Sequence, residues 1–128
     1  MYGFLMVGLG GAIGACMRYA TGLGFAGLGS SGAAYATLSV NLVGSFLLGT
    51  LSATSLGRAA TAPESALWLL LGVGIMGSFT TFSAFSRETF QMLVEGAFIR
   101  AGLYMAANLL GAVGAFCAGM MIVRRFVS

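Results

Sequence analysis

Charge is what this sequence has least of. Its 128 residues include six basic side chains, all arginine, and three acidic ones, with neither lysine nor histidine. Acid–base catalysis and metal-assisted hydrolysis depend on histidine and carboxylate side chains, so an enzyme is not expected. The net charge of +3 is scattered along the chain. It is too small for a nucleic-acid-binding surface, so no nucleic-acid partner is expected.

Cysteine and proline are also scarce, with two and one respectively. Cys16 and Cys117 lie in separate apolar segments, and we interpret both as small packing residues. The N-terminus carries no basic region and no clear small-residue cleavage site. A cleaved signal peptide is therefore not expected.

Hydrophobic residues are abundant instead. They make up 59% of the chain, and the mean hydropathy is +0.98. Few soluble domains have this composition, so we expect a single-domain, all-α, multi-pass protein of the plasma (inner) membrane. Four transmembrane helices are expected, over residues 3–23, 34–56, 65–98 and 101–123. A glycine/serine loop over 24–32 and a turn within 91–100 separate them, and a Thr61-Ala-Pro-Glu64 capping box marks the start of the third.

The third span contains signals for a break. Its 34 residues would form a helix roughly 50 Å long, whereas a bilayer core is roughly 30 Å thick. Glycines at 72, 74 and 77 weaken the helix, and hydroxyl side chains follow at Ser78, Thr80, Thr81, Ser83, Ser86 and Thr89. Hydroxyls bonding back to carbonyls one turn earlier are one explanation. For the whole cluster we favour a helix broken in mid-membrane that offers polar groups to an ion.

The arginines balance across the expected spans. Arg58, Arg124 and Arg125 fall on one side, and Arg18, Arg87 and Arg100 on the other. The positive-inside rule then sets no orientation, so the chain can insert both ways and form an antiparallel, dual-topology homodimer. The alternative is that another factor fixes a single orientation. Small residues one turn apart, such as Gly10 with Gly14, favour close helix packing, including packing between subunits.

Polar side chains recur at bilayer depth. Thr37, Asn41 and Ser45 share one helix face, and Tyr104 and Asn108 share another. Asn41 either holds the bundle together through an interhelical hydrogen bond or borders a pathway. With the hydroxyls of the third span, these groups form a donor-rich track without fixed charge. Such a track suits a small, strongly hydrated anion.

Three phenylalanines accompany this track at three-residue spacing. An aromatic ring has a positive edge, so Phe79, Phe82 and Phe85 either pack or offer edges to an anion. Arg18 either snorkels to the membrane surface or attracts anions into a vestibule. Glu88, near a membrane surface, is explained by a local ion pair with Arg87.

The motifs resemble those of the Fluc (CrcB) fluoride channels. They are Gly10-Gly-Ala-Ile-Gly-Ala-Cys-Met-Arg18-Tyr, then Val40-Asn41 with Gly44-Ser-Phe46 and Gly49, and finally Gly77-Ser-Phe-Thr-Thr-Phe-Ser-Ala-Phe-Ser86 with Glu88. The resemblance covers essentially the whole chain.

The resemblance implies a dual-topology homodimer that exports fluoride passively and lowers its cytoplasmic concentration. Asn41, Phe82 and Phe85 would line the anion path, whereas Phe79 would pack. Arg18 would be the vestibule arginine, and Ser83, Tyr104 and Asn108 are candidates for a polar track. Backbone carbonyls of Gly77 and Thr80 from both subunits would hold a structural sodium ion that is not transported.

Two other functions compete. A small dual-topology multidrug exporter requires a carboxylate in the first span, where this chain has Arg18. A purely structural subunit predicts neither the polar face around Asn41 nor the hydroxyl cluster. The fluoride channel is therefore the function predicted from the sequence.

Overall fold

The computed structural model describes residues 1–54 and 65–127, and throughout these ranges the regular structure is helical. Arg58 and the Thr61–Glu64 capping box lie outside the described residues. Three helical stretches are long and apolar enough to cross a membrane: Tyr2–Ala53, Ala66–Val94 and Phe98–Phe126. The first comprises α1 (Tyr2–Phe25), the 3-10 segment η1 (Ala26–Ser31) and α2 (Gly32–Ala53). The expected all-α class is confirmed.

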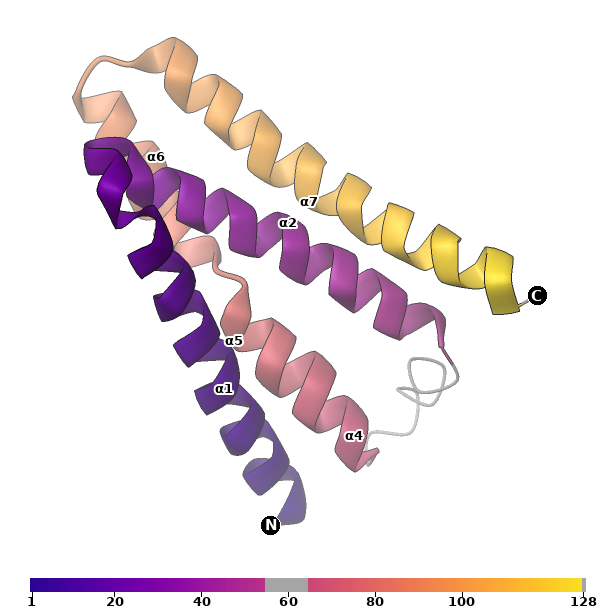
Figure 1. The fold of residues 1–128 in the computed structure, drawn as a ribbon. Coiled ribbons are helices and arrows are strands. Elements are labelled where there is room, and N and C mark those ends of the chain that lie inside the picture. Colours follow the sequence, from indigo (N-terminus) through magenta and orange to yellow (C-terminus); the bar gives the residue numbers. More distant parts are fainter. Residues whose placement is uncertain (55–64, 128) are drawn as a thin grey trace.

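The helices lie side by side in a bundle. In Figure 1, α2 runs along α7 (Phe98–Val127), and α1 runs along the segment that contains α4 (Ala66–Trp68). The α1–α2 connection and the turn before α7 lie at the same end of the bundle. The two chain termini lie at the other end.

The connection between α1 and α2 is tighter than the loop expected over 24–32. α1 continues to Phe25, η1 follows directly, and α2 begins at Gly32. Gly29 leaves helical geometry with φ 61° and ψ −140°, a conformation that glycine adopts without steric cost. A Cβ at Gly32 would lie 2.3 Å from the carbonyl oxygen of Phe25. Glycine therefore permits a short reversal where the composition suggested an open loop.

The third helical segment has four parts. α4 begins after Ser65, whose side chain accepts a hydrogen bond from the Trp68 N–H. The π-helix η3 (Leu69–Met76), α5 (Gly77–Phe79) and α6 (Phe82–Val94) follow. Thr80 and Thr81 lie between α5 and α6 in extended conformations, with ψ 159° and ψ 120°.

α6 ends earlier than the boundary expected at residue 98. The N–H of Gly96 bonds to Leu93 O at 3.0 Å, and that of Ala97 to Met92 O at 2.9 Å. Gly96 has φ 74°. This pair of bonds is a Schellman motif, and its positive φ stops the helix. The last helix then begins at Phe98 rather than at 101.

Glycines set the closest approach between α1 and the third segment. A Cβ at Gly10 would lie 2.2 Å from Leu70 O and 2.9 Å from the Cα of Gly74. Gly14 faces Ile75 O in the same way. Gly8, two residues before Gly10 on the same helix, has no neighbour within 4 Å of its Cβ position. Backbone thus packs directly on backbone, as small residues allow in a membrane.

We expect Gly10→Ala to lower the free energy of unfolding by about 1–3 kcal/mol, because the added methyl meets rigid backbone atoms. Gly8→Ala is the matched control, since its methyl enters open space, and it should leave stability unchanged. Titration of both purified variants with SDS in mixed micelles measures the effect. Equal stability of the two variants would contradict direct backbone packing at Gly10.

Candidate functional site

The break between α5 and α6 changes the hydrogen bonds of the backbone around it. In a continuous helix, the N–H of Thr81 would donate to Gly77 O, and that of Ala84 to Thr80 O. Here the Thr81 N–H donates to Asn41 Oδ1 at 2.8 Å, and the Ala84 N–H donates to Thr81 Oγ1 at 3.2 Å. The carbonyls of Gly77 and Thr80 therefore lose their usual helical donors.

Asn41 on α2 replaces part of what the broken helix loses. Its Oδ1 accepts from the Thr81 N–H, and its Nδ2 donates to Thr81 O at 3.1 Å. One side-chain amide thus satisfies both peptide groups of Thr81. The same Nδ2 donates to Asn108 Oδ1 on α7 at 2.9 Å, so Asn41 joins three helical segments.

These bonds bear on the two interpretations of Asn41. The interhelical hydrogen bond is present, and both donors of its amide are engaged. Asn108 Nδ2 donates to Tyr104 O at 3.1 Å within α7. Fewer hydrogen-bond donors are therefore free than the predicted donor-rich track requires. The side-chain amides of Asn41 and Asn108 already donate to other groups of the protein.

The hydroxyls near the break divide into two groups. Thr80 Oγ1 donates to Met76 O at 3.0 Å and Ser86 Oγ to Phe82 O at 2.9 Å, so both bond back along their own segment. Thr81 Oγ1 and Ser83 Oγ lie 3.2 Å apart. Back-bonding thus explains Thr80 and Ser86, whereas Thr81 caps α6 and pairs with Ser83.

The phenylalanines near the break differ in burial. Phe85 is 6% exposed and Phe82 is 70% exposed, with ring centroids 5.2 Å apart and planes inclined by 57°. The Phe85 ring also lies 5.6 Å from that of Tyr104. Phe79 is buried, and a Cβ at Gly44 would lie 3.2 Å from its ring. Phe79 is thus a packing residue in this chain, whereas Phe82 projects from it.

A hollow of about 240 Å³ lies beside the break. It is bordered by Asn41, Phe82, Phe85 and Asn108, together with Thr81 and Ser45. Four of the six residues predicted for an anion path therefore meet at one place. Ser83 and Tyr104 do not border it: Ser83 is exposed, and Tyr104 contacts Phe85 and Glu88. No charged side chain of the described residues lines this hollow.

Arg18 lies on a different hollow, of about 170 Å³, which it shares with Thr37, Thr81 and Glu88. The arginine predicted for a vestibule thus lines a hollow other than the one that the phenylalanines border. The two hollows have Thr81 in common.

Glu88 was not recognised as a site residue from the sequence. It is buried within the protein, with 8% of its surface exposed. It accepts hydrogen bonds from Thr37 Oγ1 at 3.1 Å and Tyr104 Oη at 2.6 Å. The expected ion pair with Arg87 is present at 3.7 Å, but the Arg87 side chain is 76% exposed. The helical spacing of Thr81, Phe85 and Glu88 could have indicated their common face.

The oxygen atoms freed at the break belong to the backbone. Within residues 1–54 and 65–127, no group of three or more His, Cys, Asp or Glu side chains could hold a metal ion. The carbonyls of Gly77 and Thr80 are hard oxygen donors and have lost their helical partners. Oxygen donors of this kind suit an alkali or alkaline-earth cation.

Comparison with known proteins identifies relatives along nearly the whole chain. A sequence model described as CrcB-like protein, Camphor Resistance (CrcB), matches residues 5–120. A Caulobacter vibrioides protein named "Fluoride-specific ion channel FluC" is 41% identical over 121 residues, 94% of each chain. Proteins of the same name from Hyphomonas neptunium and Caulobacter sp. strain K31 are 42% and 43% identical. Those alignments cover 98% of both chains for the first, and 97% of this chain and 96% of the relative for the second.

The family match and the long apolar helical stretches indicate the same class of protein. The three long apolar helical stretches identify a multi-pass membrane protein, which in bacteria lies in the plasma membrane. The matched region contains the Asn41–Thr81 contact, both phenylalanines of the hollow, and the arginine and glutamate of the second hollow. This chain belongs to the CrcB family.

Proposed function

We propose that this protein is a passive fluoride-selective ion channel that exports fluoride and lowers its cytoplasmic concentration. The observation that carries the proposal is the uncharged hollow at the helix break, bordered by Phe82, Phe85, Asn41 and Asn108. The relatives named as fluoride-specific ion channels support the choice of ion. On this proposal the protein is a channel rather than an enzyme.

The chemistry of the hollow fits an anion that must be held briefly. Ring edges carry partial positive charge, so Phe82 and Phe85 attract an anion without binding it as tightly as an arginine. A conducted ion must enter readily and also leave. Arg18, beyond Thr81, attracts anions toward the hollow through its full charge. Ser83, Tyr104 and Asn108 complete the proposed track, with Tyr104 ordering the Phe85 ring.

The functional unit on this proposal is an antiparallel, dual-topology homodimer. Each subunit crosses the membrane four times, with α1, α2, α4–α6 and α7 as the spans and the break of the third in mid-membrane. In a single chain Phe82 is 70% exposed next to the buried Phe85, so no other described part of the chain covers the Phe82 ring. A second copy that packs on this face covers Phe82 and completes the path.

A structural sodium ion is part of the proposal. The carbonyls of Gly77 and Thr80, freed by the break, would hold it at the dimer centre together with the same groups of the second subunit. Its positive charge stabilises the exposed carbonyl dipoles, which otherwise lack donors in an apolar surrounding. The ion is retained rather than transported.

The runner-up function is a small dual-topology exporter of cationic drugs. One observation favours it: Glu88 is a buried carboxylate, and such a group can bind a cation. Its two oxygens already accept hydrogen bonds from Thr37 and Tyr104, however, and Arg87 lies beside it. That environment leaves little capacity for a further cation.

Proteoliposomes loaded with fluoride or chloride test the channel directly. We expect rapid, passive fluoride efflux and negligible chloride efflux, because the weakly polar hollow discriminates by size and hydration. Ion-selective electrodes record both. Folded protein in the liposomes without fluoride release would refute the channel, and proton-coupled uptake of an organic cation would support the exporter.

Phe82 and Phe90 form a matched pair for testing the ring edges. They lie on the same helix and are 70% and 67% exposed, but only Phe82 borders the hollow. Phe82→Ile should reduce fluoride efflux at least tenfold, equivalent to about 1.4 kcal/mol of lost stabilisation at the barrier. Phe90→Ile should conduct normally. Normal efflux through both variants would make Phe82 a packing residue.

Dual topology predicts that both termini occur on both sides of the membrane. Tags at each end, probed in intact cells with an impermeant reagent, should each be labelled in about half of the molecules, because balanced arginines set no preference. With four spans both termini lie on one side, so labelling of both termini in every molecule, or in none, would exclude the antiparallel dimer. Fluoride efflux would be unaffected by that outcome, so the two proposals are separable.

A further inference from the structure

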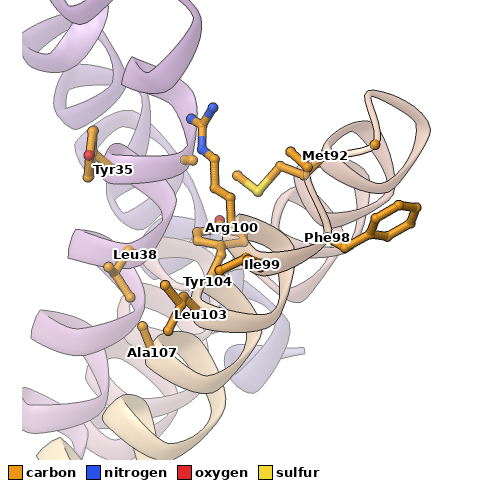
Figure 2. A pocket seen from close by; sticks show the side chains of 12 residues that line it. Tyr35, Leu38, Met92, Phe98, Ile99, Arg100, Leu103, Tyr104 and Ala107 are labelled. Carbon is orange, nitrogen blue, oxygen red and sulfur yellow. The ribbon is translucent and has the colours of Figure 1, made fainter.

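A large apolar groove lies between α2 and the start of α7, beside the turn that follows α6 (Figure 2). Its volume is about 720 Å³. Aliphatic and aromatic side chains from α2, α6 and α7 form its walls, including Leu38, Met92, Phe98, Leu103 and Ala107. It is separate from the hollow at the helix break, with which it shares no lining residue.

Arg100 stands where this groove meets a second, more polar hollow of about 360 Å³. Figure 2 shows its side chain extending away from the apolar walls. The polar hollow also contains Arg87, Gln91 and Glu95. One side of Arg100 is thus lined by hydrocarbon and the other by polar groups, an arrangement that matches an amphiphilic molecule.

The guanidinium of Arg100 retains binding capacity. Its Nη2 donates to Ser31 Oγ at 2.9 Å. In the part of the chain that the structure describes, no carboxylate lies within ion-pair distance of it. The nearby acids are engaged elsewhere: Glu88 by Thr37, Tyr104 and Arg87, and Glu95 by Gln91 at 3.0 Å. A guanidinium has five N–H donors, so several remain for an anion.

The groove also lies at a suitable depth. α7 has 30 residues, which makes it about 45 Å long, whereas the hydrocarbon core of a bilayer is roughly 30 Å thick. Arg100 is in its first turn, so its charge reaches the headgroup layer while the groove extends toward the core. Tyr35, 52% exposed, borders the groove at the same end. Arginine and tyrosine together at a helix end are typical of a membrane interface.

We propose that this groove binds one anionic phospholipid, with an acyl chain along Leu38, Leu103 and Ala107 and the phosphate group on Arg100. Apolar contacts hold the chain, and the unpaired charge selects an anionic headgroup over a zwitterionic one. The lipid neutralises Arg100 at the edge of the polar hollow. This site shares Tyr104 with the proposed polar track but has no lining residue in common with the hollow at the helix break.

Lipid binding to the purified full-length protein tests the site. After delipidation in mild detergent, native mass spectrometry compares phosphatidylglycerol with phosphatidylcholine of the same acyl chains. We expect about fivefold tighter binding of phosphatidylglycerol, the effect of one arginine next to a net negative headgroup, because the ammonium of phosphatidylcholine offsets its phosphate charge. Arg100→Gln should abolish the preference, whereas Arg125→Gln, at the other end of α7, should keep it.

A second pair of variants tests the groove itself. Leu103→Trp fills the groove and should weaken binding of both lipids. Leu110→Trp, at a position 75% exposed on the same helix and outside the groove, should not. Equal binding of the two lipids, or a preference that survives Arg100→Gln, would overturn the phosphate contact. If Leu103→Trp leaves lipid binding intact but disrupts the dimer, the groove is a subunit interface. Because the readout is bound lipid, either failure leaves the fluoride proposal untouched.

Discussion

The structure depends on how two peptide groups are satisfied where the third helical segment breaks. A backbone N–H or C=O without a partner is costly in an apolar surrounding, which is why irregular backbone is rare at membrane depth. The broken helix offers the Thr81 N–H no acceptor; Asn41 Oδ1 supplies one, and Asn41 Nδ2 also donates to Thr81 O. An amide is the side chain suited to this task, because it carries a donor and an acceptor side by side.

That contact requires α2 to approach the break closely, and Gly44 makes the approach possible. A Cβ at Gly44 would lie 2.4 Å from Thr80 Cγ2. Gly44 is three residues after Asn41, so both lie on the same face of α2. α1 packs on the preceding part of the segment through Gly10 and Gly14, again by direct backbone contact. Glycine and asparagine thus act together: the first brings the helices near, and the second bonds across the gap.

Much of this arrangement was predictable from local sequence. Hydropathy indicated the helical class, and the glycines and the hydroxyl cluster lie around Thr80 and Thr81, which are extended. The shared face of Thr37 and Asn41 was also visible, because helical spacing determines it. What local sequence did not indicate was the partner of each group. Glu88 was assigned to its neighbour Arg87, whereas its shortest contact is with Tyr104 on another helix, 16 residues away. Contacts between helices depend on rotation and tilt, which periodicity within one helix does not determine.

The position of Glu88 also explains how a carboxylate can exist beside the proposed anion path. A bare negative charge next to Phe85 would repel fluoride, and burial makes such repulsion stronger than in water. Here two hydroxyls donate to the carboxylate, Arg87 lies 3.7 Å away, and Arg18 borders the same hollow. The negative charge is therefore offset by groups on all four helical segments. At the same time Glu88 orients Tyr104, whose ring lies against Phe85. A compensated carboxylate can thus position the aromatic wall of the path, while the hollow that faces the anion stays free of charge.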